Sequence, residues 1–271
     1  MKLTKRCRFP KPTPFLKTKT NMKYIFLILA GLLFLSSCDE TSENLNLDYG
    51  YDYYPLEMGK YIIYDVDSIT YDPTSNNTKI DTTSYQVKEE IVDTTLDNEG
   101  RIVHIIHYFT RDNEDEAWAF QNLYTTVKDE RWAERTEENL KFVKLLFPQK
   151  IEDTWDGNRY FSDEGIIVTV RGETLELFKN WNSVIIDKGN SMTIGTLNFE
   201  DILTVRHADD ENLIERRFVE EKYARTVGLV EKKVMILDTQ CDGNLSNCIN
   251  LAWEEKAEKG FILKMTVNNY N

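Results

Sequence analysis

The sequence predicts a mostly β protein: an antiparallel, curved sheet, half-barrel-like in architecture, with few short helices. Three observations support this fold class. Apolar and polar residues alternate over many short runs after residue 48, as they do in strands with one buried face. Turn-forming residues separate these runs, for example at 97–100 and 187–190. No strand–helix–strand rhythm is present, so a parallel sheet is not expected.

The expected strands follow one another along the chain. The first, at 61–67, places Ile62, Tyr64 and Val66 on one face. The run 101–109 is apolar on both faces, which is typical of a central strand. Further strands are expected at 166–170, 184–187, 199–207, 229–237 and 261–267.

The run that starts at Trp118 is expected to be another strand. Its period of two places Trp118, Phe120 and Tyr124 on the same face. An acidic stretch at 112–116 precedes it and is expected to be solvated.

Two segments fit a helix and a strand equally well. In 130–147, Trp132, Thr136 and Leu140 recur at helical spacing, which favours an amphipathic helix. The second half of the same segment also reads as a strand that stops at Pro148. The segment 213–224 is ambiguous for the same reason, so both assignments stay open.

The N-terminal region resembles the signal peptide of bacterial lipoproteins. Lys23 precedes a short apolar core at 25–35, and small residues then lead into Cys38. This core is far shorter than the ~20 apolar residues that a spanning helix needs. The resemblance implies that 1–37 is a lipoprotein signal peptide and that Cys38 is the lipidated first residue of the mature chain. Attachment by two or more acyl chains, such as palmitate, would be a firm membrane anchor.

The residues on either side of this signal carry two further expectations. Seven of the eight basic residues before Cys38 lie in 1–21, which a signal does not need, so Met22 is an alternative start. The acidic stretch 38–48 is expected to be a flexible tether that leads into a β-rich domain at 49–271. An acid directly after the lipidated cysteine resembles inner-membrane retention in some lineages and surface display in others. We favour the outer membrane or the cell surface.

The charge balance excludes one class of partner. The chain has 33 basic and 46 acidic residues, and the first 37 residues hold eight basic and no acidic ones. The mature part therefore carries a formal charge of −21. Nucleic-acid binding requires basic side chains against phosphates, so no nucleic-acid partner is expected.

Two cysteines near the C-terminus are expected to form a disulfide. Cys241 and Cys248 flank a six-residue polar loop between two expected strands, and an exported protein favours their oxidation. Closing this loop would stabilise the fold by about 2.5 kcal/mol in the chain-entropy model.

Catalytic, metal-binding and cofactor-binding residues are not expected. His104 and His107 are three residues apart in a predicted strand and so point to opposite faces, while His207 lies beside acidic residues far along the chain. No nucleophile elbow, P-loop, dinucleotide-binding glycine run or zinc-protease motif is present. We therefore predict no cofactor, and the sequence favours a non-enzymatic role while leaving enzymatic activity open.

Several loose motifs resemble a group of uncharacterised bacterial envelope lipoproteins. They are the opening Tyr54-Pro55-Leu56-x-x-Gly59-x-Tyr61-x-x-Tyr64, the segment from Leu146 to Asn158, and the run Tyr223-Ala224-x-x-Val227-Gly228-Leu229-Val230. The resemblance spans most of the mature chain and implies a curved antiparallel sheet, without catalytic residues.

A weak internal repeat is consistent with two related halves within the domain. The segments 55–61 and 148–155 each run from a proline through a short loop to an aromatic residue. A single wrapped sheet is equally consistent with it.

We therefore expect a lipid-anchored protein of the cell envelope, acting as a non-enzymatic binding or assembly component with an envelope protein or glycan as partner. Two alternatives stay open. A carrier of an apolar ligand would expose an apolar lining on a concave sheet. A hydrolase of envelope polysaccharide would bring two carboxyl groups from distant strands into an aromatic-lined cleft.

Overall fold

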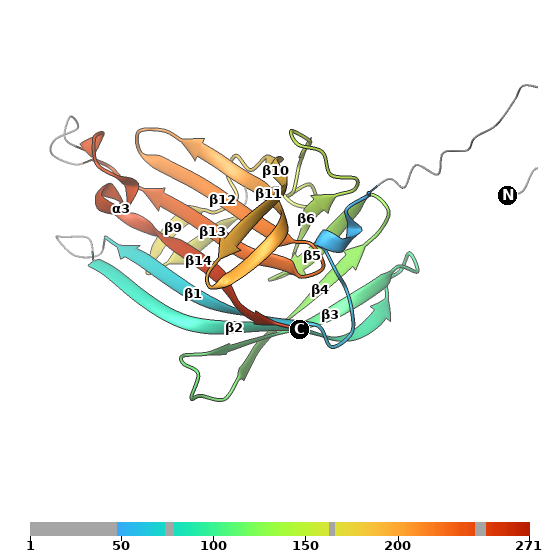
Figure 1. The fold of residues 1–271 in the computed structure, drawn as a ribbon. Helices are drawn as coiled ribbons and strands as arrows, with labels where there is room; N and C mark the ends of the chain where they lie inside the picture. The colour runs from blue at the N-terminus through green and yellow to red at the C-terminus, as the bar shows by residue number, and fades with distance from the viewer. Residues whose placement is uncertain (1–47, 74–78, 163–165, 242–247) are drawn as a thin grey trace, which may run out of the picture. The chain divides into compact units, whose positions relative to one another are not determined.

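The computed structural model describes residues 48–73, 79–162, 166–241 and 248–271, and nearly all of its secondary structure is strand (Figure 1). The first seven strands are β1 (Tyr61–Asp72), β2 (Lys79–Leu96), β3 (Ile102–Arg111), β4 (Ala119–Lys128), β5 (Trp132–Glu137), β6 (Leu140–Leu146) and β7 (Thr154–Trp155). The others are β8 (Ile167–Val170), β9 (Glu173–Glu176), β10 (Ser183–Ile194), β11 (Leu197–Glu211), β12 (Glu215–Ala224), β13 (Gly228–Asp238) and β14 (Lys259–Tyr270). The helical turns are η1 (Tyr51–Tyr53) and α3 (Trp253–Lys256).

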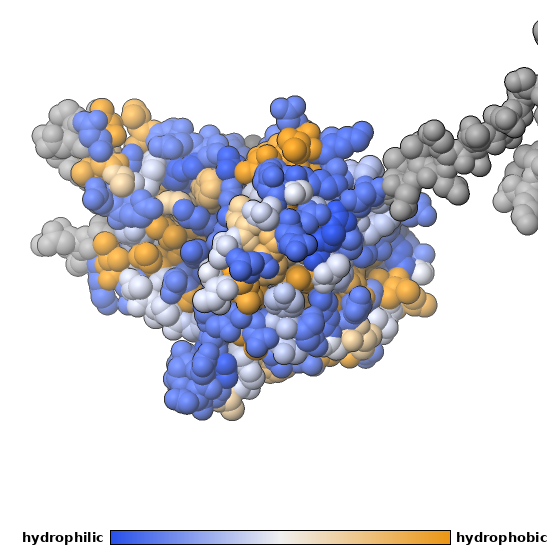
Figure 2. Space-filling view, in the orientation of Figure 1, coloured by the Kyte–Doolittle hydropathy of each residue, from blue (hydrophilic) through white to orange (hydrophobic). Residues whose placement is uncertain are grey.

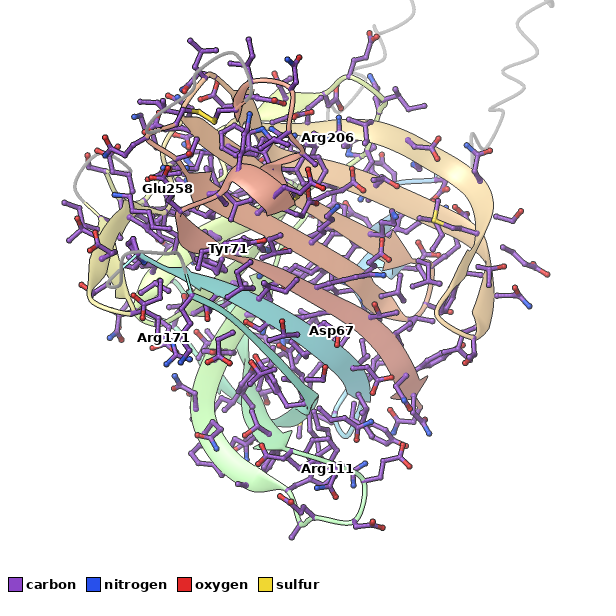
Figure 3. The ribbon with its side chains drawn as sticks, turned by 90° about the vertical axis from the view of Figure 1, so that its left-hand side faces the viewer. Asp67, Tyr71, Arg111, Arg171, Arg206 and Glu258 are labelled. Atoms are coloured by element: carbon purple, nitrogen blue, oxygen red, sulfur yellow. A yellow bond between two sulfur atoms is a disulfide. The ribbon has the colours of Figure 1, made fainter. Side chains whose placement is uncertain are left out.

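Twelve strands form one antiparallel sheet, which confirms the predicted fold class. Their order is β6-β5-β4-β3-β2-β1-β14-β13-β12-β11-β10-β7, and β8 and β9 form a separate hairpin. The last strand pairs with the first, so that β14 lies at the centre of the sheet between β1 and β13. In Figure 3, Asp67 and Tyr71 follow one another along β1 beside this pairing.

The two edges of the sheet meet, and the sheet nearly closes into a barrel. The backbone N–H of Val143 in β6 donates to the carbonyl of Gly157, just after β7, at 2.8 Å. The indole N–H of Trp155 donates to the carbonyl of Val143, also at 2.8 Å. A Cβ on Gly157 would lie 2.7 Å from the hydroxyl of Ser183 on β10, so this junction requires a glycine. Closure gives the sheet an inner face.

Bulges bend the strands on one side of this barrel. The pairing of β10 with β11 shifts register at three places, and each shift increases the local twist. The β10–β11 hairpin therefore bends across β13 and β14 (Figure 1). Ile194, Phe199 and Ile202 from this hairpin join a buried cluster with Tyr64 of β1 and Met265 of β14.

Both segments that the sequence left open are strands. The segment 130–147 forms the β5–β6 hairpin, and its turn residues Glu138 and Asn139 both have positive φ, as in a type I′ turn. The segment 213–224 contains β12, which pairs with β11 and β13. Pairing with neighbouring strands decides these cases, because the local spacing fits both structures.

The prediction that Phe120 and Tyr124 lie on the same face of a strand is wrong. Phe120 pairs with Phe109 and contacts its ring, whereas Tyr124 contacts the ring of Tyr108 on the other face of β3. The register shifts between Tyr108 and Phe109, and this bulge reverses the alternation along β4. Phe120 therefore does not share a face with Tyr124.

On the face seen in Figure 2, hydrophilic residues cover more of the surface than hydrophobic ones. The hydrophobic areas on this face are small and separate. The disulfide between Cys241 and Cys248 is present, with a Cα–Cα distance of 5.6 Å. The signal peptide, Cys38 and the start of the tether lie outside the described residues.

Candidate functional site

The interior of the barrel holds a pocket that we call the apolar chamber. It encloses about 900 Å³ of empty space, part of it open to solvent. Aliphatic and aromatic side chains from β6, β8, β13 and β14 and from the segment after β9 form most of its wall. Examples are Leu140, Phe142, Val168, Phe178, Trp181 and Leu263.

The β8–β9 hairpin and the residues that follow it cover one side of the apolar chamber. Leu175 and Phe178 are buried and fix this segment on the barrel. The ammonium of Lys179 donates to the carboxylate of Glu215 on β12 at 3.0 Å. The guanidinium of Arg217 donates from Nε to the carbonyl of Glu176 at 3.1 Å. Both packing and polar contacts therefore hold the cover in place.

A second pocket, the inner chamber, continues from the first. It encloses about 670 Å³, and its wall is rich in tyrosine and in charged side chains. Five residues line both chambers: Leu263 and the four charged residues Glu137, Lys144, Glu221 and Lys232. We call the four charged side chains the junction. They come from β5, β6, β12 and β13, which closure of the sheet brings together.

Glu221 is the centre of the junction, and its carboxylate is fully paired. Oε1 accepts a hydrogen bond from the Lys144 ammonium at 2.6 Å. Oε2 accepts from the Tyr223 hydroxyl at 2.5 Å and lies 3.0 Å from Nε2 of His207. The Nδ1 atom of His207 lies 2.9 Å from the hydroxyl of Ser183. Glu221 is only 1% exposed.

Burial and pairing act in opposite directions on the ionisation of these groups. Burial raises the pKa of Glu221, but Lys144 and His207 outweigh it and hold the pKa well below its usual range. Burial lowers the pKa of Lys144, and Glu221 offsets this only in part. Burial also lowers the pKa of His207, which favours the neutral imidazole. For Lys232, the carboxylates of Glu137 and Glu221 outweigh burial and raise the pKa.

A second ion-pair network lies along the inner chamber. Arg135 donates two hydrogen bonds to Glu89, at 2.9 and 2.6 Å, and its Nε lies 2.6 Å from Glu137. Burial raises the pKa of Glu137, yet Arg135, Lys232 and Lys144 together lower it to about 2. Both Glu137 and its partner are therefore charged at neutral pH.

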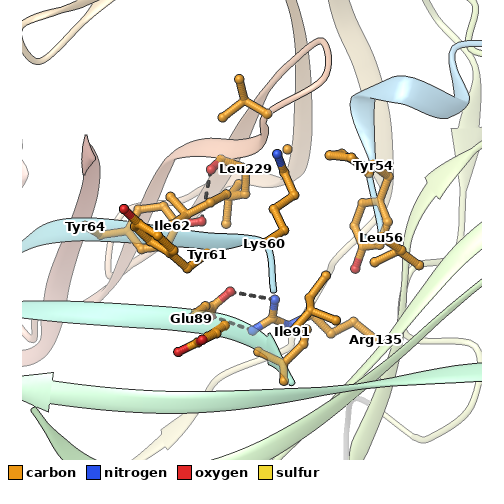
Figure 4. Close-up of a pocket in the computed structure, with 15 residues that line it drawn as sticks. Tyr54, Leu56, Lys60, Tyr61, Ile62, Tyr64, Glu89, Ile91, Arg135 and Leu229 are labelled. Atoms are coloured by element: carbon orange, nitrogen blue, oxygen red, sulfur yellow. Dashed lines mark hydrogen bonds and ion pairs between the residues drawn. The ribbon is translucent and has the colours of Figure 1, made fainter. Parts of the chain in front are cut away.

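The Glu89–Arg135 pair also borders a third pocket, at the end of the barrel where the domain begins. Figure 4 shows this pocket, with Tyr54 and Leu56 on one side and the ion pair below. It encloses about 480 Å³ and shares Tyr54, Glu89, Arg135 and Leu229 with the inner chamber. The three pockets are therefore neighbours that share parts of their walls.

Lys232 differs from the other cations of the junction. Within the described part of the chain, its ammonium makes no hydrogen bond, and its ion-pair partner is Glu221 Oε1 at 3.6 Å. Its side chain keeps 20% of its exposure because it lies against the two chambers. Three N–H donors at the junction are therefore available to a bound group.

Ser183, His207 and Glu221 resemble a catalytic triad in composition but not in arrangement. In a serine hydrolase, Nε2 faces the serine and Nδ1 faces the carboxylate. Here Nδ1 faces Ser183 and Nε2 faces Glu221. Ser183 is fully buried, and neither it nor His207 lines any of the three pockets. The arrangement is a structural network of hydrogen bonds.

The junction also tests the hydrolase alternative. Glu137 and Glu221 come from distant strands and meet in a partly aromatic pocket, as that alternative predicts. A glycosidase needs one carboxylic acid with a raised pKa to protonate the leaving group. The pKa values of both carboxyls are lowered instead. The direction of these pKa shifts therefore gives no support to the hydrolase alternative.

The three histidines lie in different surroundings. His107 contacts the rings of Phe109 and Phe120, whereas His104 is half-buried and its pKa is lowered by burial and by Lys128. Within the described residues, no group of three or more His, Cys, Asp or Glu side chains could hold a metal ion.

No helix of the described part is long and apolar enough to cross a membrane.

The residues of the junction were not singled out from the sequence. A usable signal exists in β12, where Glu221 lies between Val219 and Tyr223 on the inward face. A charged residue at an inward position of an alternating strand indicates a buried charge that needs partners. The sequence does not show which residues these partners are.

Comparison with known proteins gives limited likeness. No family model and no curated protein matches the sequence. One similar solved structure, described as an exported protein with a YmcC-like fold from Bacteroides fragilis, has a TM-score of 0.35 and 8% identity over 80% of this chain and 98% of its own. Another, described as a lipoprotein from Parabacteroides distasonis, has a TM-score of 0.32 and 9% identity over 81% and 98% of the two chains. At these TM-scores, neither likeness identifies a family or a function.

Proposed function

We propose that this protein is a lipid-anchored, non-enzymatic binding protein of the cell envelope that carries an apolar ligand inside its nearly closed sheet. The observation that supports this function best is the apolar chamber. Its wall is mainly aliphatic and aromatic, with a few charged side chains at one end, as is usual for small-molecule sites.

The state of the chamber wall supports a carrier rather than a filled structural core. Leu140, Val168 and Trp181 lie on this wall and are only partly buried. An apolar ligand would remove this surface from water, with a gain of roughly 25 cal/mol for each Å² buried. The carrier alternative requires such an uncovered apolar lining.

The anchor supports the same function by fixing the location. The lipoprotein-like signal ends at Cys38, ten residues before the described domain begins. A carrier tethered in this way would take up and release its ligand beside a membrane. The outer membrane or the cell surface is the location that we propose.

The experiment measures binding of an apolar fluorescent probe. The mature chain would be produced without its signal and with Cys38→Ser, because attached acyl chains would compete for the chamber. N-phenyl-1-naphthylamine should bind saturably, at one site per chain, with increased fluorescence. Leu263→Trp should reduce the affinity at least about tenfold by filling the chamber.

The matched control is Lys264→Trp, the neighbouring position on β14, whose side chain is exposed. It adds the same indole outside the chamber and should leave binding unchanged. Thermal unfolding of both variants checks that they are folded. Absence of probe binding by the parent chain, or equal binding by a folded Leu263→Trp variant, would refute the carrier function.

A further inference from the structure

We propose that the ligand of the lumen, by which we mean the apolar and inner chambers together, is an uncharged amphipath. Its apolar body would lie in the apolar chamber, and its hydrogen-bonding end would lie at the junction beside Lys232 and Glu137. This inference rests on the proposed carrier function and adds the chemical class of the ligand. Long-chain alcohols, acylglycerols and other neutral lipids with hydroxyl or amide groups belong to this class.

The first step is the charge balance of the interior. Three carboxylates, Glu89, Glu137 and Glu221, face the two chambers, and three cations oppose them. These cations are Arg135, Lys144 and Lys232. The formal charges of these six side chains therefore sum to zero. His207, which contacts Glu221, is neutral and does not change this sum.

Glu138 is a separate case. It also borders the apolar chamber, but it lies in the β5–β6 turn and is exposed. Its Oε1 accepts hydrogen bonds from Asn122 at 2.5 Å and from Tyr124 at 3.3 Å. Solvent therefore reaches this carboxylate, and it does not count among the interior charges.

The second step is the cost of adding a charge to this balanced set. An anionic head at the junction would lie against Glu137 and Glu221 as well as Lys232. A cationic head would meet Lys144 and Lys232, while both nearby carboxylates already have partners. Either ion would lose its hydration and leave one uncompensated charge in an interior whose own charges already balance, which is unfavourable at low dielectric.

The third step is that uncharged polar groups find free partners there. Lys232 has donors without a hydrogen bond, and Glu137 has an ion-pair partner for only one of its two carboxylate oxygens within the described residues. A hydroxyl or an amide can accept from Lys232 and donate to Glu137 at the same time. Tyr108 also lines the adjoining inner chamber.

The experiment compares three probes that share a twelve-carbon chain and differ in the charge of the head. They are monododecanoylglycerol, dodecanoate and dodecylammonium, each titrated at pH 7 and below its micelle concentration. Binding is measured as displacement of N-phenyl-1-naphthylamine from the mature Cys38→Ser chain. The neutral probe should bind about tenfold or more tightly than either ion.

Two single substitutions should change this preference in opposite directions. Glu137→Gln leaves one excess positive charge and should improve dodecanoate relative to the neutral probe. Lys232→Met leaves one excess negative charge and should improve dodecylammonium instead. Lys233→Met, at the next position of β13 and outside the chambers, is the matched control and should keep the parent preference.

The outcomes separate this inference from the carrier function. If the dye binds in the chamber but dodecanoate or dodecylammonium competes as well as the neutral probe, the carrier function stands. The inference that the ligand is uncharged is then wrong. Substitutions that shift both ions in the same direction would also overturn it. If the dye does not bind to the parent chain, both proposals fail. Thermal unfolding confirms that each variant is folded.

Discussion

At the residue scale, Glu221 combines the largest electrostatic cost with the most complete set of partners. Its carboxylate is buried beside Lys144, Tyr223 and His207. A buried ion pair contributes little net stability, but removing one partner leaves a charge without compensation. The structure therefore predicts a strong asymmetry between single and double substitutions here.

Replacing Lys144 with methionine should destabilise the fold by about 3–5 kcal/mol, because Glu221 loses its direct ion-pair partner. Urea unfolding followed by circular dichroism measures this change. The double variant Lys144→Met/Glu221→Met should recover a large part of the loss. Lys264→Met, at an exposed position of β14, is the control and should change stability by less than about 0.5 kcal/mol. A single-variant loss as small as the control's would contradict the buried pairing.

His207 should make stability depend on pH below neutrality. Burial holds its pKa below the ordinary value of 6.5, so the unfolded chain binds more protons as the pH falls. The stability that neutral His207 contributes is fully present above pH 6.5. It is lost as the pH falls through the pKa of His207 in the folded protein. The unfolding free energy should therefore decrease between pH 7 and pH 5, and the decrease should be smaller in His207→Gln.

His104 is the comparison for this measurement. Burial and Lys128 also lower its pKa, so its contribution has the same sign, but it is less enclosed. His104→Gln should therefore reduce the pH dependence less than His207→Gln does. An unchanged slope in His207→Gln would show that its imidazole does not titrate with folding.

At the element scale, the alternation of apolar and polar residues located many of the strands, but it missed β2 and placed one side chain on the wrong face. Most predicted runs are strands, because one face of each is buried and the period of two is then required. The β5–β6 hairpin and β12 escaped assignment because their apolar spacing also fits a helix. Phe120 was placed on the wrong face because a bulge leaves no mark in the local pattern.

Arg225 makes several of the contacts that hold the segment at the start of the domain. Lys128 makes others, by donating to the carbonyls of Tyr51 and Tyr54. Arg225 follows β12, and its guanidinium donates to Asp48, Asp52 and Asp201, at 2.7, 2.6 and 2.6 Å respectively. It also lies over the ring of Tyr53, 4.5 Å from the centroid. This contact joins the start of the domain to the sheet.

Arg225→Met should free this segment while leaving the barrel intact. We expect the free energy of unfolding to fall by about 1–2 kcal/mol. The decrease is modest because solvent screens these partly exposed ion pairs. Hydrogen exchange should accelerate at residues 50–54 and stay unchanged in β13. Arg206→Met, which removes surface pairs with Asp209 and Glu220, is the control and should not affect residues 50–54. Equal exchange in both variants would refute the role of Arg225.

At the scale of the whole molecule, the proposed lipid anchor and the two chambers depend on different parts of the chain. Cys38→Ala should abolish lipid labelling and leave the protein unprocessed or released from the membrane, since no acyl group can attach. Metabolic labelling with a radioactive fatty acid and cell fractionation measure both effects. Cys241→Ser/Cys248→Ser is the control, because it removes the other cysteines of the mature chain and should keep the labelling. Normal labelling and membrane retention of the Cys38 variant would refute the anchor.

The sequence by itself determined the β class, many of the strands, the absence of familiar catalytic motifs and the pairing of Cys241 with Cys248. These features are local, because strand periodicity, turn residues and a short cysteine spacing can each be read within a few residues. The lumen was decided only by the tertiary structure. Glu137, Lys144, Glu221 and Lys232 lie on four strands, and each looks like an ordinary charged residue in its own segment. They meet because the edges of the sheet close and bulges turn side chains inward, and these long-range pairings have no signature in a single sequence.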